Sequence, residues 1–288
     1  MLGLLAAIVV LALNHGCRGA PASFLVQLAQ ARRLAADLRV QFSKADDASN
    51  RAVMADTDEA SIGFAHDAEQ TTRLVETDIA ALAPLLQSLG YPEEIQALAK
   101  FEQHFGEYRK LDRNILALAV ENTNLKAQRL SFGPVREAAD TFRASLQTTV
   151  GAVAAKDRCQ AEGLVSKAVL AVRETQVLVA PHIAESDDAV MTRMEKEMTA
   201  AQATARAALG ELSGLAPPNA RTPLAAAGAA LDRFDSLTAQ LVTLSRRNSN
   251  VRSLDLALRT KPPLTAVCDD SLRALQDALA NEGSKATR

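Results

Sequence analysis

The sequence predicts an all-α protein with two antiparallel four-helix bundles stacked end to end through a long shared helix, and three observations carry this prediction. Asn122-Thr123-Asn124-Leu125-Lys126 returns as Asn248-Ser249-Asn250-Val251-Arg252, and an internal repeat of this kind indicates a duplicated structural unit. Apolar residues recur at alternating spacings of three and four, which is the period of an amphipathic helix. Aromatic residues make up only 3% of the chain and Trp is absent. A core of Ala, Leu and Val suits closely packed helices better than sheets.

The repeat extends well beyond the Asn-rich segment. Upstream, Tyr108, Leu111, Ile115 and Leu118 align with Phe234, Leu237, Leu241 and Leu244. Downstream, Asp140-Thr141-Phe142-Arg143-Ala144 aligns with Asp270-Ser271-Leu272-Arg273-Ala274. The predicted units are therefore a first bundle over 23–155 and a second over 156–283, with a disordered tail at 284–288.

The first two helices of the first unit follow from apolar spacing. The first has its apolar face at Leu28, Ala31, Ala35, Leu38, Phe42 and Ala45. The second begins after Thr57, a plausible N-cap, with Asp58 and Glu59 in its first turn, where acidic side chains complement the helix dipole. A heptad seam then predicts packing against a neighbour; it consists of Ala65, Ala68, Thr72, Val75, Ile79, Leu82, Leu86 and Leu89.

The third and fourth helices follow from the breaks between them. Gly90-Tyr91-Pro92 ends the second helix, and Pro92 suits the first turn of the third. Gly133-Pro134 marks the predicted break before the fourth helix. Between Pro134 and Ala180 there is no proline and only two glycines. We therefore expect the fourth helix to run on into the second unit as the shared helix.

The N-terminus differs from the rest of the chain. Met1–Leu13 is an apolar run that is shorter than the roughly 20 residues of a spanning helix and has the length of a signal-peptide core. Ala20-Pro21-Ala22 fits a cleavage site, and Gly16-Cys17 is similar to a lipoprotein site whose preceding residues Asn14 and His15 do not match that pattern. Residues 1–22 are predicted to be a signal peptide or membrane anchor, with a buried helix as the alternative. We expect export to the periplasm or cell envelope.

Composition and motifs exclude several classes of function. The net charge of −2, with Lys and Arg spread along the chain, gives no electrostatic reason to expect a nucleic-acid partner. The chain has no C-x-x-C-H haem motif, no Glu-x-x-His pair, no G-x-S-x-G and no phosphate-binding glycine loop. We therefore expect no enzyme activity, no cofactor and no metal. Cys159 and Cys268 are predicted to be inert thiols at opposite ends of a bundle, too far apart for a disulfide.

The repeated Asn segment is the most specific polar pattern, and two interpretations remain open. In the structural one, the seam residues Asn122 and Asn248 fix helix register, or Asn124 and Asn250 act as local caps. In the functional one, the amides and a neighbouring base grip a small anionic ligand. The candidate binding residues are Asn122, Asn124, Lys126, Asn248, Asn250 and Arg252.

Residues 42–147 resemble the four-helix-bundle ligand-binding domain of bacterial methyl-accepting chemotaxis receptors. The resemblance rests on the segment 54–60 (Met-Ala-Asp-Thr-Asp-Glu-Ala), on the segment 108–119 (Tyr-Arg-Lys-Leu-Asp-Arg-Asn-Ile-Leu-Ala-Leu-Ala) and on the polar break Asn122-Thr123-Asn124. It implies a bundle outside the cytoplasmic membrane that senses small molecules, often as a dimer. The family has no universal ligand motif, so the resemblance assigns no binding residues.

The chain also departs from that family. It has no second apolar run of spanning length and no cytoplasmic signalling hairpin, and its bundle is doubled. We therefore expect an exported sensory or ligand-binding protein without its own signalling module. Its expected partners are a small anionic ligand and a membrane protein or a second copy of the chain. The alternative is a structural scaffold of the cell envelope that binds other proteins, whose bundle faces would show an exposed apolar stripe.

Overall fold

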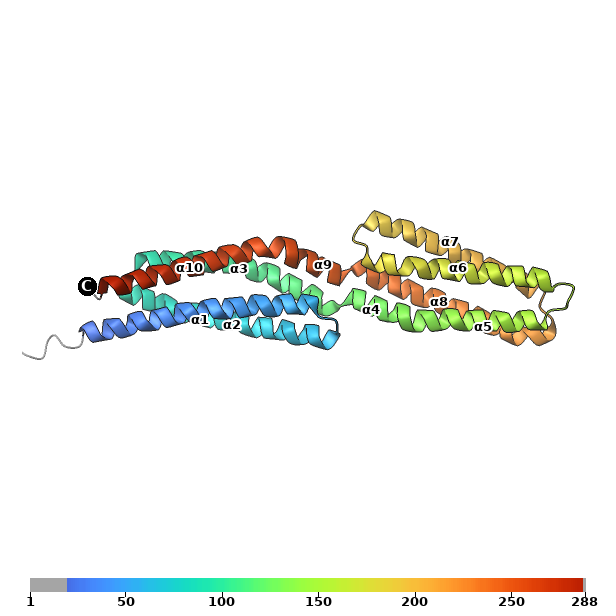
Figure 1. Cartoon of the computed structure of the whole chain (residues 1–288), viewed down its shortest axis with the longest axis horizontal. Coiled ribbons are helices and arrows are strands. Elements are labelled where there is room, and N and C mark those ends of the chain that lie inside the picture. Colours follow the sequence, from blue (N-terminus) through green and yellow to red (C-terminus); the bar gives the residue numbers. More distant parts are fainter. Residues whose placement is uncertain (1–19, 287–288) are drawn as a thin grey trace, which may run out of the picture. The chain divides into compact units, whose positions relative to one another are not determined.

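The computed structural model describes residues 20–286, and side chains within 24–282, as helices joined by short turns (Figure 1). No strand occurs in this part of the chain, so the predicted all-α class is confirmed. The helices are α1 (Ala20–Met54), α2 (Asp58–Leu89), α3 (Pro92–Glu121), α4 (Thr123–Leu130), α5 (Arg136–Ala152), α6 (Arg158–Ala184), α7 (Asp188–Ser213), α8 (Arg221–Arg247), α9 (Ser249–Asp255) and α10 (Lys261–Ala286). Short π-helical turns follow α4 (Ser131–Val135) and α9 (Leu256–Thr260), and a 3-10 turn (Pro218–Ala220) precedes α8.

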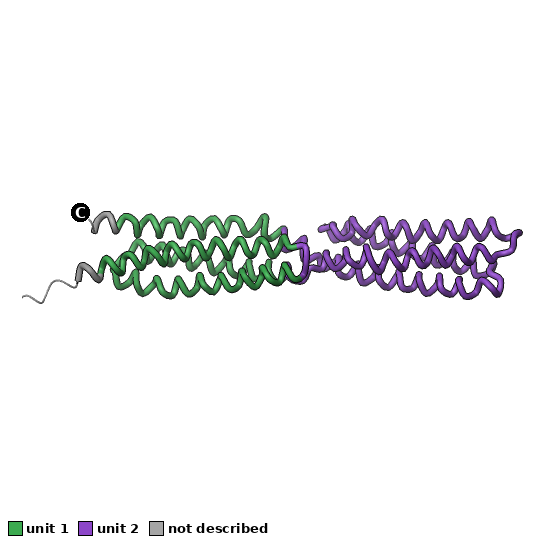
Figure 2. Tube along the Cα trace, turned by 60° about the horizontal axis from the view of Figure 1, so that its bottom comes forward, with its two compact units in different colours: residues 1–55, 59–117, 255–288 green, residues 56–58, 118–254 purple. Residues whose placement is uncertain are grey.

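The helices form two compact units whose composition differs from the predicted ranges 23–155 and 156–283 (Figure 2). Within the described residues, unit 1 comprises 20–55, 59–117 and 255–286, which are α1, α2, most of α3 and α10. Unit 2 comprises 56–58 and 118–254, with α5, α6, α7 and α8 as its long helices. The chain thus leaves unit 1 within α3 and returns to it at the end of α9, so that unit 2 is an insertion in unit 1.

The predicted long helix through 134–180 is wrong, because the chain turns between α5 and α6. Val153 has an extended backbone (φ −73°, ψ 142°), and the amide of Asp157 bonds to the carbonyl of Ala154 at 3.0 Å. The Val153 side chain is only 2% exposed, so its burial stabilises the turn. Gly151, a poor helix former, immediately precedes this turn. The fourth helix of the first repeat therefore folds back onto the first helix of the second repeat.

The predicted break at Gly133-Pro134 is also displaced. The helix ends instead at Asn122, and helical structure then continues from Thr123 through the π turn into α5. Pro134 lies inside that π turn. A proline removes one helical hydrogen bond and crowds the preceding turn, and the wider π turn absorbs such a local fault without ending the helix.

The core of unit 1 draws on all four of its helices. Phe42 of α1 makes edge-to-face contacts with Phe101 and Tyr108 of α3, at centroid distances of 5.8 and 5.1 Å. Helix α2 contributes the buried residues Val75, Ile79, Leu82 and Leu86 to the same core, and α10 contributes Cys268, Leu272, Leu275 and Leu279. The predicted apolar face of the first helix is buried throughout, and the predicted seam of the second is buried except at Thr72 and Leu89, which are half-buried.

A buried lysine ties three of these helices together. The Lys261 ammonium of α10, in a residue 1% exposed, lies 3.0 Å from Asp46 Oδ1 of α1 and 3.0 Å from Asp112 Oδ1 of α3, and donates to Ser49 Oγ at 2.8 Å. Burial raises the pKa of the Asp112 carboxyl, while Lys261 and Ser49 act to lower it. A buried charge is tolerated only when paired and hydrogen-bonded, so this cluster fixes which faces of the three helices meet.

The core of unit 2 is richer in alanine. Its buried residues come from α4, α5, α6, α7 and α8, and they include Ala138, Phe142, Leu146, Ala161, Ala168, Val172, Val179, Ala205, Ala208, Leu212, Leu231, Phe234 and Leu241. Small side chains let helices approach closely. Such side chains are also too small to fill a gap where two helices diverge.

Three predictions concern the ends of the chain and its thiols. The predicted signal peptide or anchor at 1–22 lies outside the described residues up to position 19, and α1 begins at Ala20. Of the predicted disordered tail at 284–288, residues 284–286 belong to α10, which continues to Ala286, and 287–288 lie outside the described residues. The prediction that Cys159 and Cys268 lie at opposite ends of one bundle is wrong, because the two free thiols belong to different units, with Cys159 exposed in unit 2 and Cys268 buried in unit 1. Burial raises the pKa of the Cys268 thiol to about 12. Within the described part, no helix is long and apolar enough to cross a membrane.

Candidate ligand-binding site

The repeated Asn residues are placed at the two helix breaks. Asn122 and Asn248 have φ of 49° and 52°, and among the described non-glycine residues they are the ones with positive φ. This left-handed conformation strains most side chains, and Asn tolerates it better than most residues because its short amide bonds locally. The identity of these two positions thus follows from the backbone: each ends one helix and starts the next.

The residues after each break cap the helix of the other copy. The Thr123 amide donates to Ser249 Oγ at 3.1 Å, and the Ser249 amide donates to Thr123 Oγ1 at 3.0 Å. The Asn124 amide donates to Asn250 Oδ1 at 3.1 Å, and the Asn250 amide to Asn124 Oδ1 at 3.2 Å. The first amides of a helix have no partner within it. Here the start of α4 is capped by side chains of α9, and the start of α9 by side chains of α4.

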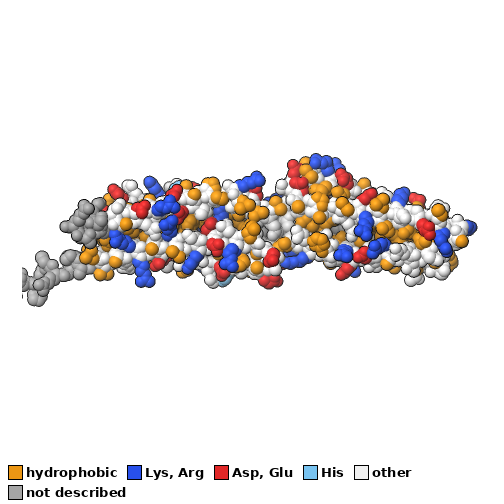
Figure 3. Space-filling view, viewed as in Figure 1, with side chains coloured by type: hydrophobic (Ala, Val, Ile, Leu, Met, Phe, Trp, Pro, Cys, Tyr) orange, Lys and Arg blue, Asp and Glu red, His pale blue; other side chains and the backbone are white. Residues whose placement is uncertain are grey.

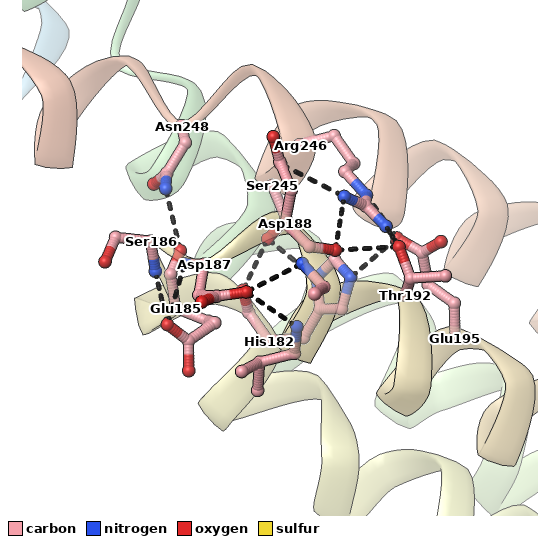
Figure 4. A network of polar contacts seen from close by, with 12 residues as sticks. His182, Glu185, Ser186, Asp187, Asp188, Thr192, Glu195, Ser245, Arg246 and Asn248 are labelled. Atoms are coloured by element: carbon pink, nitrogen blue, oxygen red, sulfur yellow. Dashed lines mark hydrogen bonds and ion pairs between the residues drawn. The ribbon is translucent and has the colours of Figure 1, made fainter.

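The side-chain amides complete this reciprocal arrangement. Asn124 Nδ2 donates to Asn248 Oδ1 and to the Ile183 carbonyl, both at 2.7 Å, and Asn250 Nδ2 donates to Asn122 Oδ1 at 2.8 Å. Asn248 Nδ2 donates to the Glu185 carbonyl at 2.7 Å (Figure 4). The structure therefore brings all four Asn residues together in unit 2 and gives them a structural role as paired caps.

The two bases of the predicted site lie on the surface beside this cluster. Lys126 is exposed and donates from Nζ to the Glu121 carbonyl at 2.8 Å, and Arg252 is exposed on α9. Neither base bonds the Asn amides. Ligand binding by Asn122, Asn124, Lys126, Asn248, Asn250 and Arg252 stays a prediction. Internal hydrogen bonds occupy the side-chain amides of Asn124, Asn248 and Asn250, whereas the buried Nδ2 of Asn122 has no hydrogen-bond partner among the described residues.

A second polar network lies beside the break, where α6, α7 and α8 meet (Figure 4). His182 contacts Ser245 Oγ through Nδ1 at 2.8 Å and Glu195 Oε1 through Nε2 at 2.9 Å. Arg246 donates from Nε to Glu195 Oε1 at 2.6 Å, and this hydrogen bond lowers the pKa of the Glu195 carboxyl. The Ser245 hydroxyl also bonds the His182 carbonyl at 2.8 Å. Ser, His and Glu are the residue types of a hydrolytic triad, but Ser245 and His182 are both fully buried, so no accessible nucleophile is presented.

A cleft between α5 and α6 has the properties of a binding site. Its volume is about 400 Å³, within the range of small-molecule pockets. Its floor is apolar and its rim is polar. The floor consists of Ala139, Phe142, Val169 and Val172, and the rim of Arg136, Asp140, Arg143, Arg173 and Gln176.

The rim of this cleft carries an excess of positive charge. Asp140 lies 3.8 Å from Arg136 Nε and 3.2 Å from Arg143 Nη2, so one carboxylate is shared by two guanidinium groups. The Arg173 side chain makes no hydrogen bond or ion pair with the described residues of the chain. Three arginines around one aspartate can hold an anion, because a guanidinium presents parallel N–H donors to a carboxylate or phosphate.

A larger groove in unit 1 is a weaker candidate. It lies along α1 and α2 with a volume of about 920 Å³. Arg39, Lys44 and Arg51 line it together with Asp47 and Asp67, so charges of both signs are mixed along it. Such a surface has no consistent preference for one ligand charge, whereas the cleft of unit 2 does.

The arginine-rimmed cleft was not predicted from the sequence. The signal that was present is the spacing of Arg136, Asp140 and Arg143, which places three charged side chains on one helical face. Arg173 could not be joined to them, because the prediction of one continuous helix through 134–180 placed it far along the same helix. The turn at Val153 is what brings it opposite Arg143.

Among the described residues, no group of three or more His, Cys, Asp or Glu side chains is placed to hold a metal ion. Comparisons of the chain with protein-family models, with curated proteins and with solved structures give no match. A function for this chain is therefore inferred from the geometry of the cleft.

Proposed function

We propose that this chain is an exported ligand-binding protein with a sensory role, resembling the periplasmic sensor bundles of chemotaxis receptors, and that it binds a small anion in the cleft between α5 and α6. The observation that carries the proposal is the cleft itself, with an apolar floor and three rim arginines facing one aspartate. A signalling membrane protein, or a second copy of the chain, is the proposed partner that reads the bound state. The apolar run at 1–13 supports export, since its length suits a signal-peptide core.

A thermal-shift screen with carboxylates, amino acids and inorganic phosphate tests the proposal. A ligand that binds the folded state raises its stability in proportion to the logarithm of its concentration. Arg173→Ala should weaken binding about 10- to 100-fold, because a hydrogen bond to a charged group contributes about 1.5–3 kcal/mol. Arg233→Ala is the matched control, since Arg233 is exposed on α8 outside the cleft. Equal ligand-induced rises in transition temperature for Arg173→Ala and Arg233→Ala would contradict the proposed site.

A scaffold role is the second candidate, and one surface feature favours it. A groove between α6 and α7 is lined mainly by apolar side chains, including Leu170, Val177, Leu178 and Ala201. Leu170 is 61% exposed and Val177 is 72% exposed, and hydrophobic side chains gather over α6 and α7 on the face shown in Figure 3. Exposed apolar surface of this kind marks protein-binding sites. This role predicts no thermal shift with any small anion, and self-association or partner binding that Val177→Glu abolishes.

A further inference from the structure

Because the two units are copies of one repeat, the interface between α5 and α6, where the cleft lies, can be compared with the equivalent interface in unit 1. Helix α5 packs with α6 in unit 2 as α10 packs with α1 in unit 1. Burial repeats along α1 and α6 at positions 130 residues apart: 31, 38 and 42 are buried, as are 161, 168 and 172. The same offset aligns Phe142 of α5 with Leu272 of α10, both buried.

In unit 1 this seam is closed by a side-chain clasp, formed by Arg39 of α1 with Asp269 and Gln276 of α10. Arg39 Nε donates to Asp269 Oδ1 at 2.8 Å and Nη2 donates to Oδ2 at 3.2 Å, while Nη1 donates to Gln276 Oε1 at 3.2 Å. Arg32, about two helical turns before Arg39, donates from Nε to the Leu279 carbonyl at 3.0 Å. Fork-like pairing of a guanidinium with a carboxylate is among the stronger polar contacts in proteins.

In unit 2 every member of the clasp is replaced by an apolar residue. The position equivalent to Arg39 is Val169, that of Asp269 is Ala139, and that of Gln276 is Leu146. Arg32 is replaced by Glu162, which cannot donate to a carbonyl. Within the described residues, no hydrogen bond or ion pair joins α5 to α6. Val169 and Ala139 instead line the cleft, so the cleft occupies the place that the clasp fills in unit 1.

We infer that a bound ligand takes the place of the missing clasp and ties α5 to α6, and that this ligand is a carboxylate with a compact apolar body. The inference rests on the proposed function of the cleft and adds to it the class of ligand and the effect of binding. Arg173 on α6 and Arg143 on α5 lie on opposite sides of the cleft, so one carboxylate held between them bridges the helices. Ala139, Val169 and Phe142 offer the apolar body a dry floor.

The same geometry disfavours a small, fully hydrated anion. Inorganic phosphate would satisfy the guanidinium groups but would leave the floor residues exposed to water. Burying the apolar body of a carboxylate adds about 25 cal/mol for each Å² removed from water. A benzoate-like ligand therefore gains binding free energy from both the floor and the rim of the cleft. Benzyl alcohol gains it from the floor alone, and phosphate from the rim alone.

The test compares benzoate, benzyl alcohol and inorganic phosphate on the full chain by thermal shift and by amide hydrogen exchange. Benzoate at about a hundredfold excess over its Kd should raise the transition temperature of unit 2 by about 5 °C or more. It should slow exchange in α5 and α6 and leave α1 and α10 unchanged. The double substitution Val169→Arg/Ala139→Asp builds the unit 1 clasp into unit 2. It should reduce benzoate binding at least tenfold and give the ligand-free chain the exchange protection that benzoate gives the original.

Arg39→Val/Asp269→Ala is the matched control, because it makes the reverse exchange in unit 1; it should speed exchange in α1 and α10 and leave benzoate binding unchanged. Should Val169→Arg/Ala139→Asp misfold by circular dichroism, Val169→Leu fills the floor without charge and should also weaken benzoate binding. No shift with any anion overturns the proposed function together with this inference. Two other outcomes overturn this inference and leave the proposed function standing. In one, benzoate and phosphate bind equally well and Arg173→Ala abolishes both. In the other, benzoate binds without slowing amide exchange in α5 and α6.

Discussion

At the residue scale, the left-handed turn and the capping of the next helix fall to different residues at each helix break. A left-handed residue at a helix end is most often glycine, and a residue that caps the next helix is most often Ser, Thr, Asp or Asn. Here Asn takes the left-handed position, and Thr123, Ser249, Asn124 and Asn250 cap across the pair. Because each copy supplies the caps of the other, a change in one copy removes bonds from both.

Asn124→Leu is therefore predicted to lower the free energy of unfolding of unit 2 by about 2 kcal/mol, since buried polar groups left without partners cost about 1–3 kcal/mol. The Asn250 amide, Asn248 Oδ1 and the Ile183 carbonyl all lose a partner. Urea unfolding followed by circular dichroism measures the change. Lys126→Ala, two residues away and exposed, should stay within about 0.5 kcal/mol. A variant as stable as the original chain would contradict the capping role.

Glu195 is predicted to make the stability of unit 2 depend on pH. Its hydrogen bond from Arg246 lowers its pKa from the usual 4.5, with His182 adding to the effect, and Asp188 shares the same arginine. A carboxyl with a lowered pKa stabilises the fold above the pKa it has in the unfolded chain and loses this contribution as the pH falls through the folded value. Unit 2 should thus lose stability as the pH falls below about 4.5.

Thermal unfolding between pH 7 and pH 3 measures this loss in the original chain and in Glu195→Gln. The glutamine variant should be less stable at pH 7 and show a smaller decline on acidification. Glu211→Gln, an exposed carboxyl at the end of α7, is the control and should follow the original chain. Parallel curves for the original chain and Glu195→Gln would show that the network does not contribute.

Features set by residues close together in the sequence could be predicted from it, whereas contacts between residues far apart in the sequence could not. The helical class, the core seam at Leu82 and Leu86, and the special status of Asn122 and Asn248 all followed from spacing or repetition along the chain. The reciprocal caps did not, because they depend on which copy faces which. Arg173 and Arg143 were separated by thirty positions in a stretch without proline, and only the burial of Val153 in an extended conformation shows that the chain reverses there.

At the element scale, the Lys261 cluster determines how α10 joins unit 1. Lys261 contacts Asp46 of α1 and Asp112 of α3, and Tyr108 contributes its ring at 5.4 Å from Nζ. The equivalent residue in the other repeat is Ser131, and Tyr108 corresponds to Phe234. The cluster is thus specific to unit 1 and distinguishes α10 from α5 as a partner for α1.

Lys261→Met is predicted to destabilise unit 1 by about 3–5 kcal/mol, because removing one partner of a buried ion pair leaves the other charges uncompensated. Asp112→Asn added to Lys261→Met should recover part of the loss. Urea unfolding of the two variants checks both statements. Lys100→Met, on an exposed face of α3, should have little effect. Loss of stability equal in the single and double variants would show that the volume of Lys261, and not its charge, matters.

At the scale of the whole molecule, the insertion of unit 2 makes the two units unequal. Apart from residues 56–58, unit 2 is one continuous segment, whereas unit 1 needs α10 from the far end of the chain. A fragment of residues 118–254 should therefore unfold cooperatively by itself. A fragment of residues 20–117 should lack a quarter of its bundle and expose the apolar faces that Leu272, Leu275 and Leu279 normally cover.

Circular dichroism and dye binding to exposed apolar surface compare the two fragments. Adding a peptide of residues 255–286 should reduce dye binding to the fragment of residues 20–117 and raise its helix content. The same peptide with Lys261→Met should do so less well. A stable 20–117 fragment that ignores the peptide would contradict the assignment of α10 to unit 1.

The interrupted composition of unit 1 also reverses the usual order of events on the ribosome. Chains are made from the N-terminus, and domains generally fold as they emerge. Here three helices of unit 1 leave the ribosome first, yet they must wait until α10 has been translated. The inserted unit, begun later, has all its helices sooner. Helices α1, α2 and α3 are thus made before unit 2 but complete their packing after it, and during that interval their apolar faces are open to chaperones or to export machinery.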